Sequence, residues 1–464
     1  MHVLSRWTAT HTRALAISIA GATALACAST RGAPVTVSAP AGAIADGEGT
    51  ALDIRGGLTV DPTLAAALAD VSADRLRHTD STLVAFGTRH AMSDTASATR
   101  GIGAARRWIS AELSRYAAEC GGCLRVEFDP AMVTVTRHPD KPSVNIVNVL
   151  AWLPGRDTSR VIVIGGHYDS CVCNVDRFDI TTNAPGADDD GSGSAAVMEL
   201  ARVFSRRYPH GLNATIVFAV YSGEELGLLG STHLAERLHA QGYRVVAAMT
   251  DDIIGNVVAD DGARDGSTVR VFGGDPDGGA SRELLRHVWG AGAAYQPSFA
   301  VLPVFRLDRV NRGGDHIPFY NKGDAAVRFT ERLENYKRQH LPTDTLADVD
   351  FAYVSRVARL NGATIGTLAA APAMPDSVTV RRDAASGGQK WRLAWRRSPG
   401  AAAYEVLVRR TSAPQWERVV GVGTDTTYLL SVQLDDAFAG VRAVGADGFR
   451  SLAAVVPPAA FVTR

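Results

Sequence analysis

Four short apolar segments constrain the fold of this chain more than any other feature of its sequence. They occur at residues 144–150, 161–164, 214–220 and 245–249. All four are rich in β-branched residues and almost free of polar ones, as strands buried on both faces must be. The segments between them have helical spacing. Strands that alternate with helices predict an α/β fold with a mixed, mostly parallel central sheet flanked by helices.

Helical spacing is clearest in three segments. Residues 61–86 and 97–119 carry apolar residues at intervals of three and four, and the second segment stops before Gly121 and Gly122. Residues 192–208 form a third amphipathic segment directly after three aspartates. Residues 29–60 are instead rich in Ala, Gly, Thr and Pro without any period, and we interpret them as a linker.

The pattern changes near residue 372, after a Pro-containing linker. Short alternating segments separated by turn residues follow, which is typical of a small β-sandwich over 372–464. Trp395, Tyr404 and Tyr428 are candidates for its core. This part of the chain resembles a fibronectin type III domain. The α/β domain is therefore expected to cover residues 61–371.

The first 28 residues are typical of an export signal. Arg6 and Arg13 precede an apolar run that ends in small residues, and the run is too short for a spanning helix. Cleavage after Ala28 fits this pattern, and lipidation of Cys27 is the alternative. The sequence thus predicts an exported protein, periplasmic, secreted or anchored by a lipid at the cell envelope, with no spanning helix in the mature chain.

Charge and cysteine content narrow the class further. The 48 Lys and Arg residues balance 48 Asp and Glu residues, so a basic footprint for nucleic acid is missing. Four cysteines remain after the signal: Cys120, Cys123, Cys171 and Cys173. An even number in an exported chain favours two disulfides, with the pairing open. A zinc site is the rival interpretation, but the second half is Cys-x-Cys rather than Cys-x-x-Cys.

Polar residues that suit metal binding follow each buried strand. His167 and Asp169 follow the strand at 161–164, Glu224 and Glu225 follow the next, and Asp252 follows the strand at 245–249. In open α/β sheets ligands gather at the carboxyl ends of strands. Several carboxylates in one cleft need a cation to offset their charge, and a mixture of His and carboxylate suits zinc, with cobalt or manganese as rivals.

Three adjacent aspartates, residues 188–190, lie in the turn before the helix at 192–208. A solvated acidic loop is the plain interpretation of such a run. The spacing of Asp188, Asp190, Ser192 and Glu199 also matches an EF-hand calcium loop, but Pro185 and Gly186 exclude the entering helix that an EF-hand needs. A turn that presents a carboxylate to a metal fits best.

The segments GGHYDS, GADDDGSGSAAV, YSGEELGLLGS and DDIIG resemble the motifs of the M28 family of zinc peptidases, in the family's order, over residues 70–370. The resemblance implies two zinc ions. His167 and Asp252 would bind one ion, Glu225 the other, and Asp189 would bridge them, because the family pattern Asp-x-x-Ser-Gly is fixed here by Ser192 and Gly193.

The resemblance also implies roles for the residues around the ions. Glu224 would be the general base and Asp169 would orient the His167 imidazole from behind. The fifth ligand would be His340, near the family's His-x-Pro-x-Asp stretch, with His316 as the competitor. Gln339 stands where some members have an oxyanion-binding Tyr, which puts that role in doubt. Glu331 and Arg312 are weak candidates for binding the substrate amine.

These features predict an exported di-zinc exopeptidase. The resemblance implies an aminopeptidase that removes N-terminal residues from peptides. Glu224 would take a proton from a water held by two zinc ions, and the resulting hydroxide would attack the peptide carbonyl. A carboxypeptidase or dipeptidase on the same centre is the alternative. Two other relatives are a single-zinc glutaminyl cyclase, which would leave His167 and Asp252 idle, and a non-catalytic receptor ectodomain, which typically loses ligands or the base.

Overall fold

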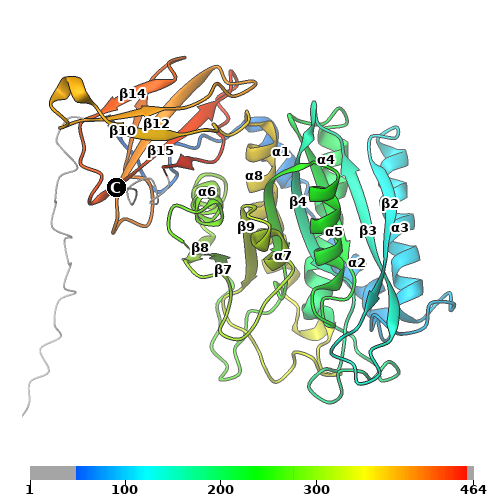
Figure 1. Cartoon of the computed structure of the whole chain (residues 1–464). Coiled ribbons are helices and arrows are strands. Elements are labelled where there is room, and N and C mark those ends of the chain that lie inside the picture. The colour runs from blue at the N-terminus through cyan, green and yellow to red at the C-terminus, as the bar shows by residue number, and fades with distance from the viewer. Residues whose placement is uncertain (1–48, 275, 457–464) are drawn as a thin grey trace, which may run out of the picture. The chain divides into compact units, whose positions relative to one another are not determined.

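The computed structural model describes residues 49–274 and 276–456 of the chain (Figure 1). The predicted export signal and Cys27 lie outside the described residues. Within the described part, no helix combines the length and apolarity that crossing a membrane requires.

The α/β domain is built on one mixed sheet, as predicted. Its strand order is β2-β3-β5-β4-β6-β9-β7-β8. The strands are β2 (Arg125–Thr134), β3 (Ser143–Leu153), β4 (Asp157–His167), β5 (Ala214–Tyr221), β6 (Arg244–Asp251), β7 (Thr268–Gly273), β8 (Ala300–Val304) and β9 (Ala326–Glu331). The four neighbours β5, β4, β6 and β9 run parallel, so their carboxyl ends lie at the same edge of the sheet. The sequence did not predict β2, β7, β8 and β9, because these strands are short or half polar.

Helices cover both faces of this sheet. They are α1 (Pro62–Ala69), α2 (Ala73–Ala85), α3 (Gly101–Glu119), α4 (Gly193–Arg207), α5 (Leu229–Ala240), α6 (Ala280–Tyr295), α7 (Ile317–Asn321) and α8 (Phe351–Ala370). The two faces follow the alternation of the strands: Ile162 and Ile164 of β4 pack with α4 and α8, whereas Val161 and Val163 pack with α5. The sheet is therefore the middle of three layers.

The predicted helix at 61–86 is in fact two helices. Helix α1 ends at Ala69, and the Ser72 hydroxyl accepts a hydrogen bond from the Arg75 backbone nitrogen to begin α2. A serine that caps a new helix interrupts a period that looks continuous in the sequence. The expected helix at 97–119 begins at Gly101 and ends, as expected, at Glu119.

The C-terminal part has two antiparallel sheets. One contains β1 (Thr50–Ala51), β13 (Arg418–Gly421), β12 (Ala403–Arg410), β15 (Ala437–Val444) and β16 (Ala454–Val455), and the other contains β10 (Thr379–Arg382), β11 (Trp391–Ala394) and β14 (Thr427–Leu430). Trp395 and Tyr404 lie in their shared core, and the partly buried Tyr428 packs against it. Strand β1 lies within the range interpreted as a linker and pairs with β13.

Side chains also join this region to α6. The indole nitrogen of Trp416 donates to the buried Glu283 carboxylate over 2.8 Å, and Arg409 lies 2.8 Å from Asp277. None of these residues is near the edge of the sheet where β4, β5, β6 and β9 end. The likeness of this part to fibronectin type III stays a prediction.

Candidate metal centre

The three adjacent aspartates point in three different directions, although all are buried. One carboxylate oxygen of Asp188 accepts from the Gly255 backbone nitrogen over 2.8 Å. The Asp190 carboxylate accepts from the backbone nitrogens of His167, over 3.0 Å, and Gly193, over 2.9 Å. Only Asp189 is left to face side chains of the candidate site. The run is therefore not a solvated loop. Asp188 and Asp190 stabilise the turn, and Asp189 points into the candidate site.

Each oxygen of Asp189 faces a different histidine. Oδ1 lies 3.2 Å from His167 Nε2, and Oδ2 lies 3.1 Å from His340 Nε2. The Asp344 carboxylate holds this arrangement from behind, because it accepts from the backbone nitrogens of Asp188 and Asp189 over 2.9 and 3.0 Å. A carboxylate with its two oxygens directed at two imidazoles has the geometry of a bridge between two cations.

We call His167 and Asp252 the inner pair. His167 is the last residue of β4 and Asp252 follows β6, and both are buried. Their facing atoms, Nε2 and Oδ1, are 3.9 Å apart. The second oxygen of Asp252 lies 2.9 Å from the guanidinium of buried Arg328. Burial raises the pKa of Asp252, but Arg328 and His167 outweigh it and the pKa lies below its usual value.

We call Glu225 and His340 the outer pair. His340 Nε2 lies 3.3 Å from Glu225 Oε2, and the imidazole is 20% exposed, whereas that of His167 is 1% exposed. Both residues of the outer pair lie in loops, one after β5 and one after β9. His340 adopts a left-handed backbone conformation with φ of 58°. The outer pair is therefore held by loop structure, and the inner pair by strand ends.

The nitrogen and oxygen atoms of the inner pair, the outer pair and Asp189 are arranged as ligands of metal ions rather than as hydrogen-bond partners of one another. Ligand atoms of His167, Asp189 and Asp252 all lie within 4.8 Å of each other, and so do those of Glu225, His340 and Cys171. Among the described residues, His167 Nε2 and Glu225 Oε1 are buried without a hydrogen-bond partner. Such atoms are costly to bury unless something coordinates them. Imidazole and carboxylate donors on both sides of a bridging carboxylate suit zinc.

Glu224 faces the same space without belonging to either pair. It lines a cavity of about 390 Å³ together with Asp189, Glu225, Asp252 and His340. Burial raises the pKa of Glu224 well above its usual range; His167 opposes this shift, while Asp252 and Glu225 add to it. A carboxylate that is free of the donor clusters and holds a proton readily can act as a general base.

The carboxylate of Asp169 contacts the loop that carries Glu224 and Glu225, which the sequence did not indicate. Its carboxylate accepts from the backbone nitrogens of Gly223, Glu224 and Glu225, over 2.8, 3.3 and 3.3 Å. The atom at hydrogen-bond distance from His167 Nδ1 is the Asp169 backbone oxygen, at 3.1 Å, while the carboxylate is 3.7 Å away. One buried residue thus positions the base, one ligand of the outer pair and the imidazole of the inner pair.

Of the two histidines considered for the fifth position, only His340 lies beside Asp189. His316 is buried elsewhere, with Nε2 2.8 Å from the Leu307 backbone oxygen. Burial lowers the pKa of His316 to about 4. Glu331 is also buried, where Oε2 accepts from the Asn256 backbone nitrogen over 2.6 Å, whereas Arg312 does line the cavity.

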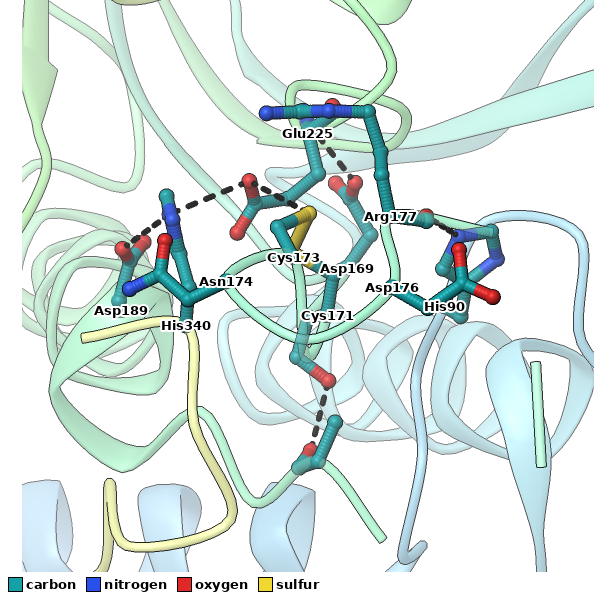
Figure 2. Close-up of a disulfide and its surroundings, with 12 residues drawn as sticks. His90, Asp169, Cys171, Cys173, Asn174, Asp176, Arg177, Asp189, Glu225 and His340 are labelled. Carbon is teal, nitrogen blue, oxygen red and sulfur yellow. Dashed lines mark hydrogen bonds and ion pairs between the residues drawn. A yellow bond between two sulfur atoms is a disulfide. The ribbon is translucent and has the colours of Figure 1, made fainter. Parts of the chain in front are cut away.

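The two predicted disulfides are present, as Cys120–Cys123 and Cys171–Cys173. The second lies against the outer pair, with Cys173 Sγ 3.7 Å from Glu225 Oε2 (Figure 2). Asn174 beside it donates to the Gln339 backbone oxygen over 2.9 Å, next to His340. This disulfide therefore belongs to the wall of the candidate site, and the zinc interpretation of the four cysteines is not needed.

Sequence reasoning missed Arg328 and Asp344. Arg328 stands in the otherwise buried strand β9, and a charge there was an available signal of a buried ion pair. Asp344 is the last residue of the His-x-Pro-x-Asp stretch that was used only to find His340. Both act on residues that are far away in the sequence, which the spacing of motifs does not show.

Comparisons with known proteins show the family and the fold of this chain. The sequence profile of peptidase family M28 matches residues 148–365. The chain is 39% identical to a probable zinc metalloprotease of Pyrenophora tritici-repentis, over 84% of this chain and 86% of the relative. It is 39% identical to another of Pyricularia oryzae, over 86% and 85%. Among solved structures, the Legionella pneumophila aminopeptidase LapA has a TM-score of 0.53 at 22% identity, over 68% and 76% of the two chains.

Proposed function

The chain belongs to peptidase family M28, and from this premise we propose that its site is a di-zinc centre that removes N-terminal residues from peptides. The coarser function, a zinc-dependent peptidase, follows from the family and from relatives named as zinc metalloproteases. The observation that carries the proposal is Asp189, whose two oxygens face His167 and His340 at 3.2 and 3.1 Å.

The inner pair and one oxygen of Asp189 would hold one ion. The outer pair and the other oxygen of Asp189 would hold the second. When bound, such ions polarise the scissile carbonyl and lower the pKa of the attacking water. Glu224 accepts the proton of that water at its carboxylate and then delivers it to the amine that leaves. Asp169 keeps Glu224 and Glu225 in place through their backbone nitrogens.

The size of the cavity supports an exopeptidase. Its volume of about 390 Å³ lies near the lower end of the roughly 300–1,000 Å³ that ligand sites span. That space suits the side chains next to one scissile bond better than an extended stretch of polypeptide. Peptides with free and with acetylated N-termini would separate an aminopeptidase from a carboxypeptidase, because only the first needs the free amine.

Export belongs to the same proposal. Both cysteine pairs of the described part form disulfides, which persist in oxidising compartments. Edman sequencing of the protein recovered outside the cytoplasm is expected to start after Ala28, or to be blocked at Cys27 if that residue is lipidated. Accumulation of the full-length chain in the cytoplasm would contradict export.

Two neighbouring variants test the mechanism. Glu224→Gln is expected to keep two zinc ions and to lose roughly 10²–10⁴-fold in kcat, the usual contribution of a general base. Glu225→Gln is expected to weaken zinc binding at the outer pair, with activity partly recovered in excess zinc. Zinc content and turnover of both variants measure the difference. Loss of zinc from Glu224→Gln, or near-full activity in it, would contradict the assignment.

A further inference from the structure

We propose that the site prefers peptides that carry a carboxylate next to the scissile bond, recognised by arginines of the cavity wall. The proposal rests on the di-zinc function above and adds the class of substrate. The cavity is lined by four arginines, which are Arg137, Arg177, Arg309 and Arg312. Only Leu228 and Ile317 among its large lining side chains are apolar. A pocket for a large apolar residue would have the opposite composition.

The charge balance of the cavity favours an anion once zinc is bound. Four lining carboxylates, those of Asp189, Glu224, Glu225 and Asp252, oppose the four arginines. Two Zn²⁺ ions carry four positive charges and would offset all four carboxylates. The arginines are then left without a counter-charge inside the cavity. This local excess contrasts with a chain whose Lys and Arg total, 48, equals its Asp and Glu total.

Arg309 is neutralised most completely of the four, because it pairs with both Asp308 and Glu334. Its guanidinium lies 2.6 Å from the Glu334 carboxylate and its side chain is 8% exposed. Glu334 also pairs with Arg270, outside the cavity lining. Arg312 lies 3.8 Å from Glu334. Arg309 and Glu334 therefore stabilise the cavity wall, and the positive charge of Arg309 is not free to bind a ligand.

The other three guanidinium groups are available to a ligand. Arg137 is exposed and stands over the loop that follows Glu225, so close that a Cβ at Gly227 would lie 3.4 Å from its Cζ. Arg177 donates to the Glu225 backbone oxygen over 2.5 Å, and Figure 2 shows it beside the outer pair. Within the described chain, neither Arg137 nor Arg177 has a carboxylate within ion-pair distance.

Arg312 is the best oriented of the three. Its guanidinium donates to the Gln339 side-chain oxygen over 3.2 Å and lies 5.9 Å from the centre of the Tyr336 ring. Its side chain remains 30% exposed. A planar guanidinium held on one side can still form a paired contact with a carboxylate on the other. Arg312 was considered for the substrate amine in the sequence, but its charge suits the opposite group.

Two parts of a peptide can supply such a carboxylate. One is an acidic side chain on the N-terminal residue, and the other is the free C-terminus of a dipeptide. Matched substrates distinguish them: the anilide of Glu against that of Gln, and the dipeptide Gln-Ala against its C-terminal amide. We expect one charged member to exceed its neutral partner by about 10- to 100-fold in kcat/KM, the range of a charge-assisted hydrogen bond. The excess is expected to shrink as salt rises.

Variants connect the preference to the arginines. Arg312→Gln and Arg137→Gln are each expected to lower the charged-to-neutral ratio, and Arg312→Lys to retain part of it. Arg244→Gln is the matched control, because Arg244 is an exposed arginine at the opposite end of β6 from Asp252. Arg312 contacts Gln339, which is next to His340, so Arg312→Gln could lower activity on every substrate. Such a general loss does not change the charged-to-neutral ratio, because both substrates are measured with the same variant. An equal loss on both members in Arg312→Gln and Arg137→Gln would overturn the role of these arginines.

A binding measurement separates this proposal from the peptidase assignment. Calorimetry with the zinc-loaded enzyme is expected to show tighter binding of glutamate α-amide, which has a side-chain carboxylate, than of glutamine α-amide, which has no carboxylate, whether or not any peptide is cleaved. Equal binding of the two, together with equal kcat/KM in both substrate pairs, would overturn the carboxylate preference. Cleavage of neutral anilides at the same time would leave the peptidase function standing.

Discussion

The inner pair and the outer pair both face Asp189 but are built differently. His167 and Asp252 follow adjacent parallel strands, are buried, and have Arg328 behind them. Glu225 and His340 lie in loops, with 20% of the His340 side chain exposed and a disulfide against the carboxylate. In the proposed two-ion centre, one position would therefore be fixed by the sheet and the other would depend on local loop contacts.

The largest effect is expected from the residue that both pairs share. Asp189→Asn keeps the size of the side chain but removes the charge that would face two ions. Zinc content is expected to fall at both positions, and kcat to fall by about 10⁴-fold or more, at least the upper range for loss of a general base. Retention of two zinc ions per chain in Asp189→Asn would show that it does not bridge.

A change behind the inner pair is expected to act mainly on stability. Arg328→Met leaves the buried Asp252 and Asp308 carboxylates without the guanidinium that lies 2.9 and 3.2 Å away. Removing one partner of a buried ion pair lowers the free energy of unfolding by about 3–5 kcal/mol. Zinc is expected to restore part of this, because an ion would again offset the charge of Asp252.

The outer pair supplies the control for that experiment. His340→Gln changes a loop residue whose side chain is 20% exposed and lies beside the Asp189 and Glu225 carboxylates, so the metal-free protein is expected to lose about 1 kcal/mol, less than Arg328→Met loses. Urea denaturation of both metal-free variants measures the contrast. Equal destabilisation by both would remove the distinction between the two pairs.

Asp169 connects the pairs and is expected to have an intermediate effect. In Asp169→Asn, one acceptor oxygen becomes an amide donor, so at least one of the three backbone nitrogens at Gly223, Glu224 and Glu225 loses its partner. Groups that orient metal ligands typically account for about 10–100-fold in metal affinity or activity. Competition with a chelator, followed together with kcat, is expected to show losses of that size in both. A change in kcat alone would limit Asp169 to positioning the base.

The smallest effect is expected from the disulfide beside the outer pair. The double variant Cys171→Ser and Cys173→Ser is expected to lower the zinc affinity of the outer pair only. The expected loss is less than about tenfold, the lower end of the effect of groups that contact a metal ligand. The double variant at Cys120 and Cys123, which is far from both pairs, is the control. Zinc titrations that show an equal change in both double variants, or a change at the inner pair, would contradict a local role.

The two pairs also differ in how far the sequence could predict them. Both residues of the inner pair, and Glu225 of the outer pair, were found because a buried apolar run ends and a polar residue follows, which places the residue at a shared sheet edge. For His340 and His316 the residues offer no such rule, and only resemblance to a family motif favoured His340. In the structure, His340 lies 3.1 Å from Asp189, whereas His316 contacts the Leu307 backbone oxygen.

Interactions between distant segments were not predictable in this way. The sheet and its central strands follow from local composition, since β-branched runs form buried strands. The Arg328 contact to Asp252 and the Asp344 contact to the aspartate turn depend on strand order and loop return. The break between α1 and α2 depends on one capping hydroxyl, that of Ser72. None of these is recorded in the spacing of residues along one segment.

Anomalous diffraction at the zinc edge, from crystals of the zinc-loaded wild-type protein, tests the central claim most directly. The account predicts two peaks about 3.5–4 Å apart, the usual separation in two-metal sites, with one at the inner pair and one at the outer pair. Each peak should contact a different oxygen of Asp189. A single peak, or two peaks of which either lacks contact with Asp189, would contradict the account.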